Sequence, residues 1–291
     1  MRTRIVLHTR NMRRLLPLTL ALTACASSQV APTALEPSTT LVLTSEARWE
    51  QLNPARGDKS PKAATLWGDR QGTGPTGFLL HPADGFRSPP HAHNVSYRGV
   101  VIRGLIHNDE PNADEMWMPP GSFWTQPKGG VHITAAKGSD TLAYIEIEEG
   151  PYLVLPVDKA FDSEEKPLNV HESSIDWTEQ LNLPASAIGP KVARLWGNPQ
   201  DAQPSGALVK LPPGFSGTMR SRGASFRAVV TQGRAKHGVP GQTEVKTMVP
   251  GSYFSSKGES AHHVSTELGE ECILYVRTEG KLDVVPDQPD E

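Results

Sequence analysis

This 291-residue chain has few cysteines, no apolar run long enough to cross a membrane, and no excess of basic residues. Two cysteines, Cys25 and Cys272, cannot form the disulfide framework of a small secreted scaffold. The apolar stretch at residues 15–24 is too short to span a bilayer, which needs roughly 20 apolar residues. With 29 Lys and Arg against 32 Asp and Glu, the net charge of -3 gives no indication of a nucleic-acid partner.

Glycine and proline are abundant, with 26 residues of each, and helical periodicity is absent after the leader. Short apolar or alternating runs at 77–80, 98–103 and 142–147 are bounded by these turn formers. This pattern predicts an all-β protein of many short strands. A chain of this length fits one or two domains.

The N-terminus is typical of a bacterial export signal. Five arginines fall within the first 14 residues, and the apolar stretch 15–24 follows. Its end, Leu-Thr-Ala-Cys at 22–25, resembles the lipobox of bacterial lipoproteins, which implies cleavage and lipidation at Cys25. We therefore expect a signal peptide at 1–25 and a lipid-anchored protein of the cell envelope, in the outer membrane if the host is Gram-negative. An ordinary secretory signal with a chance cysteine is the alternative.

Residues 26–45, rich in Ala, Ser, Thr and Pro, predict a flexible tether between the anchor and the folded part.

The rest of the chain is an internal duplication. Trp-Glu-Gln-Leu-Asn at 49–53 recurs as Trp-Thr-Glu-Gln-Leu-Asn at 177–182, and Leu-Trp-Gly at 66–68 recurs at 195–197. Four glycines recur after about 129 residues: Gly77, Gly85, Gly104 and Gly121 correspond to Gly206, Gly214, Gly233 and Gly251. The two predicted units are 46–158 and 174–287.

Histidines are concentrated in the first unit. His91 and His93 are two residues apart, so on a strand both imidazoles leave the same face. His132 follows a turn marked by Pro127 and Gly129 and begins another strand-like segment. Three imidazoles on one concave face would suit a divalent transition metal.

The spacing of these residues resembles the two motifs of the cupin superfamily. The first motif matches at Gly85, His91, His93 and Gly104, and the second at Gly121, Pro127, Gly129 and His132. The whole chain is similar to a family of bacterial tandem cupins without an assigned reaction. The resemblance implies two double-sheet jelly-roll barrels and one metal ion, Fe, Zn, Mn or Ni, in the first barrel.

Tyr97 and Arg98 stand where cupins usually carry a glutamate ligand. The site is therefore interpreted as three histidines plus water or substrate. Tyr97 is a candidate catalytic residue that would hydrogen-bond a metal-bound water or substrate, although Phe226 at the matching position is equally consistent with a core role.

The second unit has lost the metal ligands: Arg220 and Arg222 replace His91 and His93, and only His262 keeps the type of His132. A guanidinium group is a cation that only donates hydrogen bonds, so it cannot replace an imidazole as a metal ligand. Two interpretations remain open. The second barrel either carries a decayed site or binds an anion through Arg220, Arg222 and His262.

Three functions fit the sequence. The first is an envelope-anchored metalloenzyme, an oxygenase acting on a small molecule. The second is a non-catalytic module that binds or senses a metal or small ligand, and the third is a structural lipoprotein. Fused cupins commonly form a pseudo-dimer, so the chain is expected to be either a monomer or a homodimer.

Overall fold

The computed structural model describes residues 39–179, 189–200, 203–238 and 243–288. Cys25, the signal peptide and most of the predicted tether lie outside these ranges. Strands dominate, and the helices are short 3-10 turns: η1 (Thr44–Glu46), η2 (Pro54–Lys59), η3 (Val157–Lys159) and η4 (Glu172–Ser174). Across the described ranges, no helix combines the length and apolar character needed to cross a membrane.

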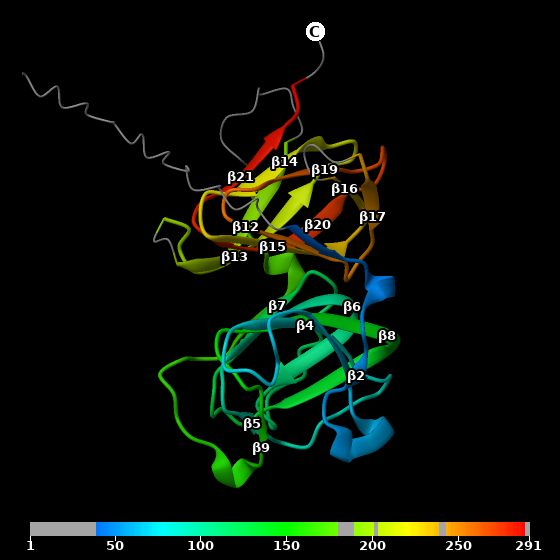
Figure 1. Cartoon of the computed structure of the whole chain (residues 1–291). Helices are drawn as coiled ribbons and strands as arrows, with labels where there is room; N and C mark the ends of the chain where they lie inside the picture. The colour runs from blue at the N-terminus through cyan, green and yellow to red at the C-terminus, as the bar shows by residue number, and fades with distance from the viewer. Residues whose placement is uncertain (1–38, 180–188, 201–202, 239–242, 289–291) are drawn as a thin grey trace, which may run out of the picture. The chain divides into compact units, whose positions relative to one another are not determined.

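The first unit is a two-layered barrel (Figure 1). Its large sheet has the strand order β10-β7-β6-β8-β4-β3-β2, and a small sheet pairs β5 with β9. The strands of this barrel are β2 (Glu50–Gln51), β3 (Lys62–Trp67), β4 (Thr76–His81), β5 (Ala92–His93), β6 (Tyr97–Asp109), β7 (Phe123–Gln126), β8 (Ile133–Ile147), β9 (Val154–Leu155) and β10 (Leu168–Val170).

Strands β6 and β8 bend together and so contribute to both layers of the barrel. Their register shifts between Val101 and Leu105, around Gly104. Gly104 has a φ of 71°, and a Cβ there would lie 2.2 Å from Oγ1 of Thr141. Only glycine fits this close approach in a left-handed conformation. Gly104, the last glycine of the first motif, therefore permits the bend in β6 after which residues 105–109 pair with 133–137.

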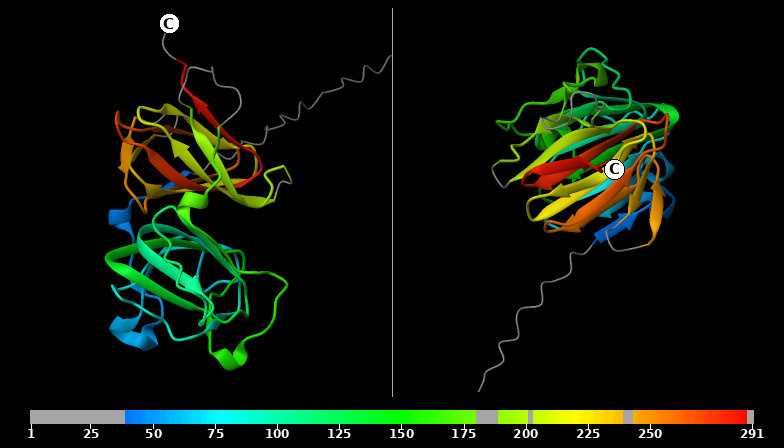
Figure 2. Two further views of the ribbon diagram at one scale, coloured as in Figure 1. Left: turned by 180° about the vertical axis from the view of Figure 1, so that it is seen from behind. Right: turned by 90° about the horizontal axis from the view of Figure 1, so that it is seen from above.

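The second unit repeats the architecture. One sheet has the order β1-β18-β15-β20-β13-β12-β11 and the other β17-β16-β19-β14-β21. The yellow-to-red strands of this unit form a second barrel in the left view of Figure 2. The strands are β11 (Thr178–Glu179), β12 (Lys191–Trp196), β13 (Pro204–Leu211), β14 (Ser216–Ser221), β15 (Ser225–Gln232), β16 (Ala235–Gly238), β17 (Val245–Met248), β18 (Tyr253–Lys257), β19 (Ala261–Ser265), β20 (Cys272–Glu279) and β21 (Leu282–Pro286).

The two barrels exchange their leading strands. β1 (Thr39–Val42), which precedes the first barrel, pairs antiparallel with β18 of the second; the N-terminal blue strand is visible there in Figure 1. β10, which precedes the second barrel, pairs with β7 of the first. The predicted tether therefore extends too far at its C-terminal end, because residues 39–46 form β1 and η1. A run rich in Thr and Leu pairs readily once a sheet edge is available.

Apolar side chains form three clusters. One lies inside the first barrel and includes Phe78 and Trp124; another lies inside the second and includes Phe226 and Phe254. The third cluster draws residues from both barrels, with Tyr144 and Tyr275 among its fully buried members. The structure is thus a pair of jelly rolls, as the duplication and motifs predict, and the two barrels also share an apolar layer.

Candidate metal centre

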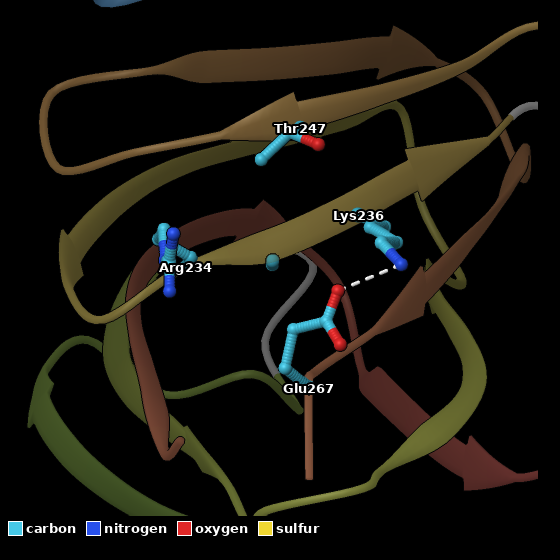
Figure 3. Close-up of a pocket in the computed structure, with 5 residues that line it drawn as sticks. Arg234, Lys236, Thr247 and Glu267 are labelled. Carbon is cyan, nitrogen blue, oxygen red and sulfur yellow. Dashed lines mark ion pairs between the residues drawn. The ribbon is translucent and has the colours of Figure 1, made fainter. Parts of the chain in front are cut away.

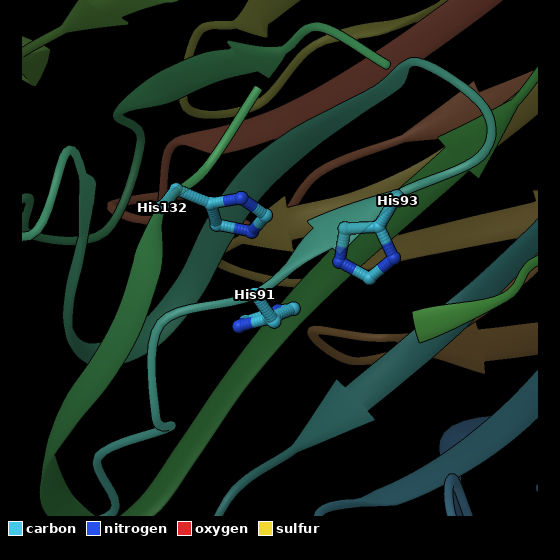
Figure 4. A group of neighbouring side chains, drawn as sticks. All are labelled: His91, His93 and His132. Carbon is cyan, nitrogen blue, oxygen red and sulfur yellow. The ribbon is translucent and has the colours of Figure 1, made fainter. Parts of the chain in front are cut away.

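Three histidines of the first barrel gather around one point. His91 and His132 face each other across an antiparallel bridge whose two N–H···O distances are 3.0 and 2.9 Å, and His93 lies on β5. The ring centroid of His132 is 4.3 Å from that of His91 and 5.2 Å from that of His93. Figure 4 shows the three imidazoles on neighbouring segments. One ligand atom from each ring lies within 4.8 Å of the other two. The structure therefore brings together the three histidines that the motifs single out.

Each histidine is oriented through its Nδ1 by a backbone carbonyl. The acceptor is Pro89 O for His91 at 2.9 Å, Leu153 O for His93 at 2.9 Å, and Gly130 O for His132 at 3.2 Å. A proton held on Nδ1 leaves the lone pair on Nε2, the arrangement typical of metal-binding histidines. The residues therefore fit a divalent transition metal bound by three Nε2 atoms.

The environment keeps the imidazoles neutral, as metal ligation requires. Burial lowers the pKa of His132 to about 3 and that of His93 well below its ordinary value; neighbouring histidines add to both effects. Burial also lowers the pKa of His91, with a smaller contribution from the positive charge of Arg56. A metal would thus not compete with protons near pH 7.

Tyr97 lies beside this cluster and belongs to a buried polar network. Its hydroxyl donates to Oδ1 of Asn108 at 2.8 Å and lies 3.3 Å from Nε2 of His132. Asn108 also accepts from Thr134 and donates to Gln126 at 3.0 Å. Burial raises the pKa of Tyr97, so the phenol stays protonated. Sequence reasoning missed Asn108 and Gln126, whose signal is an amide at an otherwise apolar inward position of a strand.

Tyr152 is a second phenol at the site that sequence reasoning missed. Its ring stacks on His93 with centroids 4.5 Å apart, and its hydroxyl lies 3.2 Å from Nε2 of His93. It follows β8 in a segment that closes over the site: β9 pairs with β5, and Phe161 N–H donates to Gly129 O. Gly129 has a φ of 77°, and a Cβ there would lie 2.1 Å from Phe161 O. The second-motif glycine thus permits this close covering.

A carboxylate ligand is missing from the group. Among the residues that the structure describes, only the three histidines lie close enough together to share an ion. The protein therefore offers three neutral nitrogen ligands, which leaves coordination positions open for water or substrate.

The predicted anion site of the second barrel is not formed. Arg220 and Arg222 extend towards the surface, where both guanidinium groups pair with Asp283. His262 is fully buried: its Nδ1 lies 2.9 Å from Nε2 of His237, and its Nε2 lies 2.9 Å from Oγ of Ser256. Strand β14 presents Met219 and Ser221 to the interior instead, because successive residues alternate faces. The two guanidinium groups and the imidazole therefore do not share a site.

A hollow of about 370 Å³ on the second barrel is lined by Arg234, Lys236, Thr247 and Glu267 (Figure 3). Its cations are already paired, Lys236 with Glu267 and Arg234 with Glu270. This hollow therefore has no uncompensated charge with which to attract a ligand.

Solved structures with the same architecture are tandem-barrel proteins. A candidate dioxygenase from Nostoc punctiforme has a TM-score of 0.61 at 14% identity, over 90% of each chain. Oxalate decarboxylase from Lactobacillus farciminis has a TM-score of 0.56 at 11% identity, over 86% of this chain and 88% of that one. Salicylate 1,2-dioxygenase from Pseudoaminobacter salicylatoxidans has a TM-score of 0.55 at 14% identity, over 88% of this chain and 87% of that one.

At these identities the similarity establishes the fold, two tandem cupin barrels, and not the reaction. Comparison with the curated proteins gives no match. Residues 40–285 match a family described as a domain of unknown function, DUF4437. This match covers most of the sequence, including both barrels and the three histidines, and the chain therefore belongs to the DUF4437 family.

Proposed function

We propose that this protein is a metal-dependent enzyme of the oxygenase type that acts on a small molecule at His91, His93 and His132. The observation that carries the proposal is the orientation of the rings, each held by a backbone carbonyl at Nδ1 with Nε2 left for a metal. A divalent transition metal bound there would supply Lewis acidity and, in the case of iron, oxygen activation.

The chain itself would orient the substrate and limit water. Three neutral imidazoles contribute no ligand charge, which favours an anionic substrate that chelates the metal. Tyr97 remains a protonated phenol, and the covering segment around Tyr152 and Phe161 restricts access from solvent. The proteins named salicylate 1,2-dioxygenase and oxalate decarboxylase share the fold and act on carboxylates, which supports testing such compounds here.

The first test is elemental analysis of the protein purified without added metal. We expect one transition-metal ion per chain, and its loss in His91→Ala and His132→Ala. His263→Ala, which removes an exposed histidine of the second barrel, serves as the matched control and should keep the metal. A wild-type protein that binds no metal even after incubation with Fe(II), Mn(II) or Zn(II) would contradict the metal site.

The second test is oxygen uptake by the Fe(II)-loaded protein with β-diketones, thiols, salicylate, gentisate and oxalate. Oxygen consumption that depends on one of these compounds, and that is lost in His132→Ala, is the expected result. A fully loaded protein that consumes no oxygen across the panel would refute the oxygenase. It would favour the alternative of a non-catalytic module that binds or senses a small ligand at the same histidines.

We also propose that the mature protein is anchored to the cell envelope through a lipid on Cys25. The support is the Leu-Thr-Ala-Cys sequence at 22–25 after a basic, apolar leader. Metabolic labelling with a radioactive fatty acid in a bacterial host should mark the wild-type protein, and Cys25→Ser should abolish the label. A wild-type protein that is secreted and unlabelled would indicate an ordinary signal peptide.

A further inference from the structure

Tyr152 and Leu153 both contact the His93 imidazole. The carbonyl of Leu153 accepts the Nδ1 proton of His93 at 2.9 Å, and the Tyr152 ring stacks on the imidazole with an interplanar angle of 22°. Asn94 fixes this segment in turn, because its amide donates to Pro151 O and accepts from Leu153 N–H, both at 2.9 Å. Tyr152 is therefore placed by several bonds beside the metal-facing nitrogen of His93.

The two phenols of the site differ in what their protons do. The Tyr97 hydroxyl donates to Asn108, a bond that does not involve a histidine nitrogen. The Tyr152 side chain is half-buried, and within the described part of the chain the one hydrogen-bond partner of its hydroxyl is Nε2 of His93. Because that nitrogen carries the lone pair a metal would take, metal binding removes the acceptor of Tyr152 and leaves Tyr97 satisfied.

A hydroxyl that loses its acceptor at a covered site gains from a new one, so a ligand oxygen next to the metal would be stabilised by accepting the hydrogen bond of Tyr152. The charges around the site favour an anion for this role. No carboxylate of the described residues joins the three imidazoles, so a divalent metal bound there would keep its full positive charge. A hydrogen bond to a charged acceptor is also stronger than one between neutral groups.

The second barrel supports the same assignment. Phe226 stands at the position of Tyr97. Ser221 takes the place of His93 and pairs with Leu282 as His93 pairs with Val154, so Gly280 stands at the position of Tyr152. The barrel without the three histidines has therefore lost both phenols as well.

We propose that Tyr152 determines the ligand specificity of the site by donating a hydrogen bond to an oxygen of a carboxylate-bearing small molecule bound at the three histidines. This inference rests on the metal site of the proposed function but not on the oxygenase reaction. Tyr97 in this arrangement keeps its bond to Asn108 and lies beside His132.

The experiment uses the Co(II)-loaded full chain and follows its visible absorption during titration with oxalate. Tyr152→Phe keeps the ring that stacks on His93 and removes only the hydroxyl. We expect this variant to bind one cobalt ion at least as tightly as the wild type and to bind oxalate about tenfold more weakly, as for the loss of a hydrogen bond to a charged group. Tyr253→Phe, which deletes a buried hydroxyl in the second barrel, is the matched control and should leave both affinities unchanged.

Oxalate affinity equal to that of the wild type in Tyr152→Phe would overturn the inference. Weaker cobalt binding with an unchanged oxalate affinity for the loaded fraction would also overturn it, because Tyr152 would then only support His93. A wild-type protein that takes up no cobalt would overturn both this inference and the metal site. Failure to consume oxygen would refute only the oxygenase, since the cobalt titration does not involve that reaction.

Discussion

A buried ion pair joins the two barrels and can be tested by removing its cation. Glu146 on β8 and Arg277 on β20 are 1% and 2% exposed. The guanidinium lies 3.3 Å from a Glu146 oxygen and forms two bonds, of 2.7 and 2.8 Å, to Glu148. Glu146 also accepts from the hydroxyls of Tyr275 at 2.7 Å and Tyr144 at 3.1 Å. The pair is thus fully enclosed and connected to both barrels.

Arg277→Met should destabilise the protein strongly, because it leaves the Glu146 charge buried without its cation. Breaking a buried pair by removing one partner costs about 3–5 kcal/mol. In a protein of roughly 250 folded residues, each kcal/mol lowers the melting temperature by about 2–4 °C. The melting temperature of Arg277→Met should therefore fall by about 6–20 °C. The guanidinium also lies 5.5 Å from the Trp67 ring and 5.3 Å from the Trp196 ring, and the loss of these contacts acts in the same direction.

The assay is urea and thermal unfolding of the wild type, Arg277→Met, and the double variant Glu146→Met with Arg277→Met. We expect the double variant to recover much of the stability, since two apolar side chains of similar volume replace a buried pair at little cost. Arg222→Met, which removes an exposed guanidinium paired with Asp283, is the control and should change little. A loss of less than about 1 kcal/mol in Arg277→Met would refute the reasoning, because an unpaired buried carboxylate cannot be so inexpensive.

Three further predictions follow from the fold and the site. Deletion of residues 39–45 should lower the melting temperature of the second barrel, because β18 loses its edge partner; an unchanged midpoint in calorimetry would contradict the strand exchange. Gly129→Ala should destabilise the chain by about 1–2 kcal/mol, since the new Cβ must adopt a positive φ and clash with Phe161 O, and urea unfolding measures this. In the metal-free protein, the unfolding free energy should fall as the pH drops below about 6.5, because the unfolded chain then protonates histidines that the fold keeps neutral. With a folded pKa of about 3, His132 should contribute about 1.4 kcal/mol per pH unit between pH 5.5 and 4. Replacing His132 by Gln should reduce the slope of the unfolding free energy against pH by this amount. A slope identical to that of the wild type would contradict the burial of His132 as a neutral ring.

The three metal-site histidines were predictable because local spacing determines their arrangement. His91 immediately precedes β5 and His93 ends it, so the two are two residues apart on one extended segment, and the glycine at 129 permits the turn that returns the chain to His132. The duplication was equally visible, since repeated glycines mark backbone positions that a side chain would block. Gly121 and Gly251, at φ of 91° and 93°, are one such pair.

The strand exchange could not be predicted, because strand pairing between distant segments has no local signature. The β1–β18 pairing, for example, joins segments more than 200 residues apart. Tyr152 was missed for a related reason: its role depends on the contact between the covering segment and His93, not on spacing within a motif. The predicted anion site is not formed because the match by glycines is off by one residue at this strand: Met219, not Arg220, lies opposite His262, as His91 lies opposite His132. Arg220 and Arg222 are turned to the surface, where a charge is readily solvated.

The differences between the barrels indicate a division of roles. At the place of the metal site, the second barrel packs His237, His262 and Phe226 into a closed interior in which both nitrogens of His262 are used by protein partners. The same barrel supplies Arg277, the cation that Glu146 of the first barrel requires. Because the duplicated position carries Glu in one barrel and Arg in the other, pairing of two identical copies would place like charges together in a buried layer. The second barrel has therefore become a specific partner for the first, and we expect the chemistry to be confined to the barrel that kept its histidines.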